Sequence, residues 1–149
     1  MKLLRRDIAG IAKKELEYTP LGPVFKALGA IFIDRSNKKK AIQAMKPAVE
    51  ALKGGTSIVI APEGTRSGSK TLGAFKKGAF HLAIKGGVPI IPIVIKNAYM
   101  AMPKGSKIFK PTHIEVVVLD PVDTSEWKAK NIDTYVEEVR NLFLEELEN

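Results

Sequence analysis

The chain has 149 residues, 45% of them hydrophobic and 27% charged, a balance typical of a single globular domain over residues 1–149. The absence of cysteine excludes disulfides and thiol catalysis and favours a reducing, cytoplasmic setting, and no apolar run reaches the about 18 to 20 residues of a membrane span. The net charge is +8, but residues 131–149 carry −5, so residues 1–130 carry +13 and should attract anionic partners.

Taken in chain order, the sequence alternates between two kinds of segment. Short β-type runs at residues 8–12, 30–33, 56–61, 89–95 and 113–119 are separated by segments with helical spacing. This pattern predicts an α/β fold with a mostly parallel central sheet flanked by helices.

Two helices are predicted most clearly. Residues 38–53 place apolar side chains on one helical face before Gly54 and Gly55, which supply a stop. Pro47 should kink or break this helix. Residues 132–147 carry an apolar stripe opposite acidic side chains, which predicts a packed terminal helix.

Charged side chains follow two of the predicted strands. One loop after a strand holds Glu63 and Arg66, and Arg35 follows the strand predicted at 30–33. The carboxyl ends of parallel strands share one edge of a sheet, so we expect both arginines to converge with Glu63 on one anion site. Guanidinium groups bind phosphate with two donors, and Gly64 permits close approach of the backbone.

Three ordered blocks carry a family resemblance. They are Gly-Ala-Ile-Phe-Ile-Asp-Arg at 29–35, Pro-Glu-Gly-Thr-Arg-Ser at 62–67 and Val-Pro-Ile-Ile-Pro-Ile at 88–93. They resemble the second, third and fourth blocks of the glycerolipid acyltransferase family, best known from the lysophosphatidic acid acyltransferases. Ala61 stands where the family's third block begins with phenylalanine. Order and approximate spacing agree from about Lys13 to Ile95.

The resemblance implies transfer of a fatty acyl group from a thioester of coenzyme A or acyl carrier protein to the hydroxyl of a lysophospholipid. The thioester is a co-substrate, and neither a cofactor nor a metal is implied. The positions matching the family's acceptor-binding residues are Arg35, Glu63, Gly64, Thr65 and Arg66. Because acceptor and product partition into lipid, we expect a cytoplasmic protein in peripheral contact with the anionic inner face of the membrane.

The sequence departs from the family in its first block, a histidine followed after four intervening residues by an aspartate. In that block the histidine is the general base and the aspartate orients it. The two histidines here, His81 and His113, are followed at that spacing by Gly86 and Val118. His81 lies in an apolar helical run and His113 near the start of a predicted strand, so we assign no catalytic residue. We expect the catalytic block ahead of residue 1, which makes this a partial domain with low turnover.

Two alternatives come from other function classes. Residues 64–71 nearly match the phosphate loop of nucleotide hydrolases, with Ser69 where glycine belongs, and residues 116–120 imitate its magnesium-binding strand. The second alternative is a non-catalytic basic module that binds anions, RNA or DNA. Aromatic residues are only 7% of the chain and form no stacking run, so no specific nucleic acid is expected as a partner.

Overall fold

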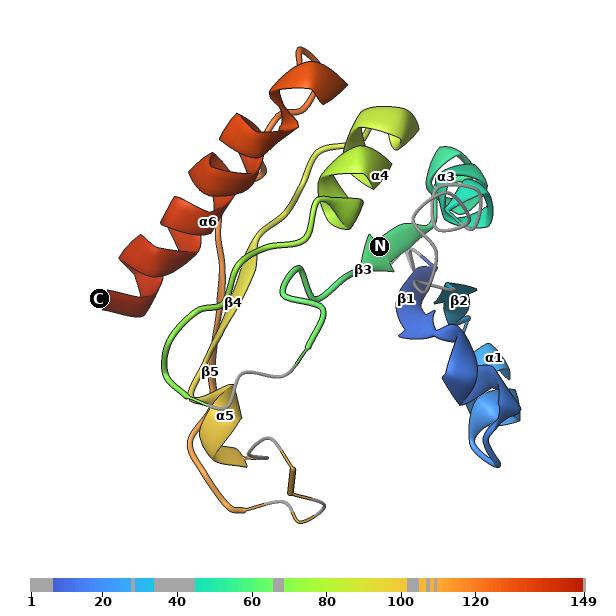
Figure 1. The fold of residues 1–149 in the computed structure, drawn as a ribbon, viewed down its shortest axis with the longest axis vertical. Helices are drawn as coiled ribbons and strands as arrows, with labels where there is room; N and C mark the ends of the chain where they lie inside the picture. The colour runs from blue at the N-terminus through green and yellow to red at the C-terminus, as the bar shows by residue number, and fades with distance from the viewer. Residues whose placement is uncertain are drawn as a thin grey trace, which may run out of the picture. The chain divides into compact units, whose positions relative to one another are not determined.

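The computed structural model describes residues 7–27, 29–33, 45–65, 69–101, 105–106, 108 and 110–148 (Figure 1). The chain separates into two compact units, and the boundary falls between Ile60 and Ala61. That residues 1–149 form a single domain stays a prediction.

The N-terminal unit is built on a parallel sheet of three strands in the order β2-β1-β3. Its elements are β1 (Ile8–Lys13), the 3-10 helix η1 (Lys14–Tyr18), α1 (Gly22–Ala27), β2 (Ile31–Ile33), α3 (Lys46–Lys53) and β3 (Ser57–Val59). Ile11 pairs with Ile31 on one side of β1, and Ala9 pairs with Ile58 on the other. The predicted parallel sheet is thus confirmed here, with strand bounds close to those expected.

The helix α3 shows how the sequence sets local boundaries. It begins at Lys46, so Pro47 lies in its first turn, where a proline costs no helical hydrogen bond. Residues 38–44 lie outside the described ranges, so a kink or break at Pro47 in a helix over 38–53 stays a prediction. Gly55 has φ of +90° and ends the helix as predicted, because the amide of Thr56 donates to the carbonyl of Ala51 at 3.0 Å.

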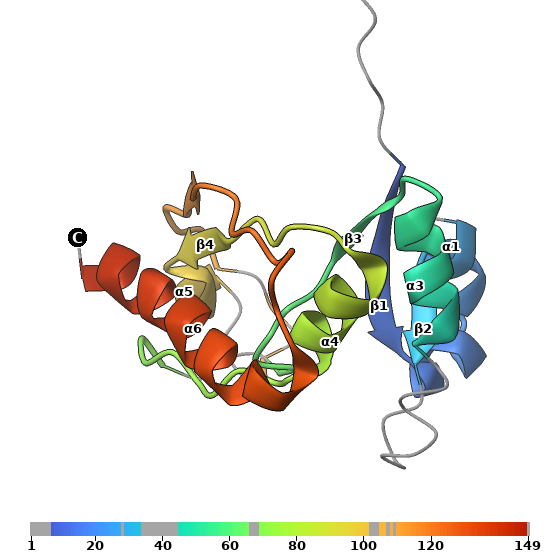
Figure 2. The same cartoon turned by 90° about the horizontal axis from the view of Figure 1, so that it is seen from above.

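The C-terminal unit combines helices with an antiparallel pair of strands. Its elements are α4 (Gly78–Gly86), β4 (Ile93–Lys96), α5 (Ala98–Ala101), β5 (Glu115–Val118), the 3-10 helix η2 (Ala129–Asn131) and α6 (Ile132–Glu148). The strands β4 and β5 pair from Ile93 with Val118 to Lys96 with Glu115. In both views α6, drawn in red, lies alongside α4 (Figure 1 and Figure 2).

The core of this unit joins α4 to α6. Its buried side chains are Phe75, Phe80, Ile132, Val136 and Val139. The ring of Trp127 stacks between neighbours, with centroids 6.0 Å from Phe80 and 4.4 Å from Tyr135. Phe75 meets Phe143 edge to face at 5.1 Å. The prediction of a packed terminal helix is confirmed, because its apolar stripe supplies three of the five buried residues.

The predicted strands at 89–95 and 113–119 do not extend a parallel sheet. Between them, the described residues hold only the four-residue helix α5, which is shorter than the crossover helix that usually joins parallel strands. The chain therefore returns beside β4 in the opposite direction. Pro92 precedes β4 and its carbonyl accepts from the amide of Leu119 at 3.0 Å, in keeping with a proline at the start of a strand.

No helix among the described residues combines the length and the apolar character that crossing a bilayer requires.

Candidate functional site

The described part of the third block, residues 61–65, is called the motif loop. Its turn is closed by a hydrogen bond from the amide of Gly64 to the carbonyl of Ala61 at 3.1 Å. Gly64 has φ of +70°, a left-handed conformation that residues with a Cβ adopt at a cost. Thr65 follows on the exposed surface. Glycine at this position therefore serves the shape of the turn.

Two hydrogen bonds attach the motif loop to the segment before α4. The half-buried Glu63 accepts from the amide of Gly73 at its Oε2 atom, over 2.8 Å. The amide of Lys76 donates to the carbonyl of Pro62 at 2.7 Å. A carboxylate that accepts from a backbone amide is held in one orientation, so Glu63 has a defined position before any ligand arrives.

The segment is in turn held by the terminal helix. Arg140 of α6 donates from Nε to the carbonyl of Gly73 and from Nη2 to the carbonyl of Leu72, both at 3.2 Å. The sequence motifs predict neither Gly73 nor Arg140 as a residue of the site. One signal was present: Arg140 is the single basic residue in the acidic range 131–149.

The predicted acceptor-binding residues fall into two groups. The structure brings Glu63, Gly64 and Thr65 together in one turn. Arg35 and Arg66 lie outside the described residues, and their convergence with Glu63 stays a prediction.

The two histidines occupy different environments. His81 is half-buried in α4, and its pKa is lowered, first by burial and then by the positive charges of Lys85 and Lys77. A histidine oriented by a carboxylate would experience the opposite electrostatic effect. His113 is exposed and lies two residues before β5, so the strand begins two residues later than predicted. Neither environment is that of the family's general base.

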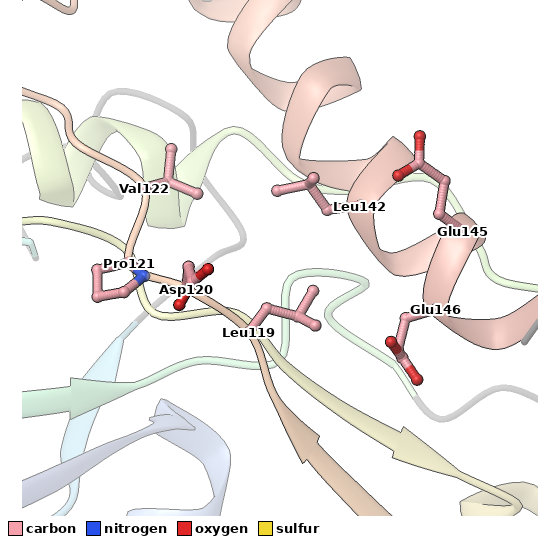
Figure 3. A pocket seen from close by; sticks show the side chains of 7 residues that line it. All are labelled: Leu119, Asp120, Pro121, Val122, Leu142, Glu145 and Glu146. Carbon is pink, nitrogen blue, oxygen red and sulfur yellow. The ribbon is translucent and has the colours of Figure 1, made fainter.

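The structure shows a hollow of about 390 Å³ between residues 119–122 and α6. Figure 3 shows Leu142 projecting from α6 toward this segment, and Asp120, Glu145 and Glu146 also line the hollow. Glu146 also pairs with Lys96 at 2.7 Å. Three carboxylates make this hollow a poor site for a phosphate.

A second hollow, of about 540 Å³, lies in the N-terminal unit against β2 and includes Lys14 and Lys26. No residue of the motif loop lines either hollow. Among the described residues, no group of three or more histidines and acids is placed to hold a metal ion.

The nucleotide-loop alternative requires a helix that starts at its lysine and hydroxyl residue, here Lys70 and Thr71. Residues 69–77, all of them described, contain no helix, and α4 begins only at Gly78. A phosphate held in such a loop would lack the helix N-terminus on which that site depends. The structure therefore disfavours this alternative.

Comparison with known proteins supports the family resemblance that the motif loop carries. The family model for acyltransferases matches residues 1–96. Over 140 residues the chain is 39% identical to a 1-acyl-sn-glycerol-3-phosphate acyltransferase of Limnanthes alba, covering 93% of this chain and 50% of that protein. The corresponding enzyme of Saccharomyces cerevisiae is 36% identical over 140 residues, with 91% and 46% covered.

A solved structure gives the same result. The crystal structure of the 1-acyl-sn-glycerophosphate (LPA) acyltransferase PlsC from Thermotoga maritima superposes with a TM-score of 0.74 at 36% identity, covering 94% of this chain and 56% of that one. The chain thus spans about half the length of the relatives that it matches. The α/β fold class is confirmed, and the chain belongs to the acyltransferase family.

Proposed function

We propose that this chain is the acceptor-binding part of an enzyme that acylates lysophosphatidic acid in phospholipid biosynthesis. The observation that carries the proposal is the ordered motif loop, in which Glu63 is already held by the amide of Gly73. The names of the relatives, 1-acyl-sn-glycerol-3-phosphate acyltransferases, support this acceptor. On this proposal Arg35 and Arg66 bind the phosphate, and the turn at Glu63, Gly64 and Thr65 shapes the site beside them.

The acyl donor is a thioester of coenzyme A or acyl carrier protein, used as a co-substrate with no bound cofactor. These 149 residues contain no histidine and aspartate at the family's spacing. Without that base, the proton of the acceptor hydroxyl has no partner that removes it. Turnover by these residues alone should be very low, while acceptor binding is retained.

The place of action is the anionic inner face of the membrane, approached from the cytoplasm. Residues 1–130 carry +13, which favours adsorption to acidic headgroups. Such adsorption depends on charge and weakens with salt, whereas recognition of a phosphate monoester by arginine forks depends on geometry. The two contributions can be separated by experiment.

Sedimentation with phosphatidylcholine vesicles tests the proposal, at about 0.15 M salt to screen exposed charges. Three vesicle preparations are compared, containing lysophosphatidic acid, lysophosphatidylcholine, or phosphatidylglycerol as an anionic control. The chain should prefer the first preparation. Arg66→Gln and Arg35→Gln should each reduce that preference by about tenfold, the effect of losing a hydrogen bond to a charged group.

Lys70→Ala is the matched control for the loss of one positive charge. It should leave the preference for lysophosphatidic acid unchanged, whereas a nucleotide-binding loop would lose its ligand. Equal binding to lysophosphatidic acid and phosphatidylglycerol would reject the proposed acceptor. Tighter binding to RNA in a gel shift at the same salt would favour the basic anion-binding module.

A further inference from the structure

Arg140 lies on α6, far along the sequence from the motif loop. Its side chain is 24% exposed, and the same helix buries Val136 and Val139. Nε and Nη2 donate to two consecutive carbonyls, those of Gly73 and Leu72. Its third contact, from Nη1 to Glu137 at 3.8 Å, is long. The principal hydrogen-bonding partner of this guanidinium is therefore the segment before α4.

The carbonyl of Leu72 and the amide of Gly73 belong to one peptide group. Arg140 donates to the carbonyl end of that group, and Glu63 accepts from its amide end at 2.8 Å. A cation at a carbonyl polarises the peptide group and makes its N–H a better donor. The guanidinium and the carboxylate thus strengthen each other's hydrogen bonds through the peptide group between them.

A side chain at Gly73 would meet the carboxylate of Glu63. A Cβ placed there would lie 2.7 Å from the Oε2 atom of Glu63, well inside contact distance. The clash involves the end of a flexible side chain, so the fold can adapt by moving the carboxylate of Glu63. Glycine at this position permits the bond between Gly73 and Glu63.

We propose that Arg140 is a positioning residue for acceptor binding. By holding the peptide group between Leu72 and Gly73 it fixes the carboxylate of Glu63, and with it the turn that presents Gly64 and Thr65. This inference rests on the proposed function and adds a residue of α6, outside the range 1–96 that the family model matches. The affinity for lysophosphatidic acid then depends on a helix that carries no family motif.

The first test measures vesicle binding by the full chain, as above. Arg140→Gln should weaken binding to lysophosphatidic acid vesicles about tenfold, because it removes charge-assisted hydrogen bonds. Binding to phosphatidylglycerol vesicles should stay close to that of the wild type. Arg140→Lys keeps the charge but loses the planar fork, so it should restore part of the affinity. Lys130→Gln, an exposed charge in η2, is the matched control and should have no specific effect.

The second test breaks the same link from its other end. Gly73→Ala should displace Glu63 and weaken lysophosphatidic acid binding to a similar degree. If both residues act through one peptide group, the double variant should lose little more than the weaker-binding single variant. Independent structural damage would instead give additive losses and would overturn the inference.

Backbone amide exchange, followed by NMR, decides whether the loop itself responds. The Gly73 amide should exchange faster in Arg140→Gln, while amides in the middle of α6 keep their protection. Unchanged exchange at Gly73, or a lysophosphatidic acid preference that survives Arg140→Gln intact, would overturn this inference alone. A wild-type chain with no such preference would instead reject the proposed acceptor, and the inference would fail with it.

Discussion

The two units of this chain bury different kinds of side chain. Among the described residues, the N-terminal unit buries only small or flexible hydrophobic side chains, those of Ala9, Met45 and Ala48. The C-terminal unit buries large ones, namely Phe75, Phe80, Leu82, Val94, Ile132, Val136 and Val139, together with Ala83. Buried apolar area is the main favourable contribution to folding, so the C-terminal unit should be the more stable of the two.

The difference bears on how the proposed acceptor site is held. Glu63 belongs to the unit with the large core and is connected to it through Gly73 and Arg140. Arg35 belongs to the sequence of the other unit. We therefore expect the motif loop around Glu63 to be rigidly supported within its own unit, and substitutions in each core test the difference in stability.

The largest effect is expected from Phe80→Ala. Phe80 is 1% exposed and packs on Trp127, so truncation leaves a cavity and should cost about 3 to 5 kcal/mol of unfolding free energy. Urea unfolding followed by Trp127 fluorescence measures the loss. Lys85→Ala on the exposed side of the same helix is the control, and it should change stability by less than about 0.5 kcal/mol. A loss below about 1 kcal/mol for Phe80→Ala would contradict the importance assigned to this core.

A smaller effect is expected from Ala48→Leu in the other unit. Ala48 is completely buried, and extra methyl groups there should cost about 1 to 3 kcal/mol through overpacking. Amide exchange should accelerate in β1 and β3 while α6 stays protected. Lys53→Leu, exposed at the end of α3, serves as the control. Equal acceleration in both units would show that they unfold together and would break the comparison.

The smallest effect is expected from pH. It should change the stability of the C-terminal unit, because both histidines lie in that unit. Burial, with Lys85 and Lys77, lowers the pKa of His81 from its ordinary value of 6.5. The unfolded chain therefore takes up a proton first as pH falls through 6.5, so stability decreases from there down to the lower folded pKa. Urea unfolding between about pH 7.5 and 5.5 should show this decrease, and His81→Gln should flatten it. If the free energy of unfolding of His81→Gln falls with pH as steeply as that of the wild type, other groups cause the decrease.

Much of the fold follows from local patterns in the sequence. The stripe over residues 132–147 predicts α6, and Gly54 with Gly55 predicts the end of α3. The short apolar runs at 8–12 and 30–33 predict β1 and β2 within about one residue at each end. The family blocks identify Glu63, Gly64 and Thr65 as candidates, and the structure places these three in one turn.

Other features depend on contacts between distant residues. The antiparallel pairing of β4 with β5 is not visible in periodicity, because pairing direction depends on how the intervening chain returns. The same is true of the bonds from Gly73 to Glu63 and from Arg140 to Leu72 and Gly73.

The sequence by itself therefore determined the family, the fold class and the chemical character of the candidate loop, because motif and periodicity are local properties of neighbouring residues. The tertiary structure alone decided how Glu63 is oriented. That orientation requires three separate segments to meet, namely the motif loop, the peptide group between Leu72 and Gly73, and Arg140 of α6. Only packing of the core around Phe75 and α6 brings them together.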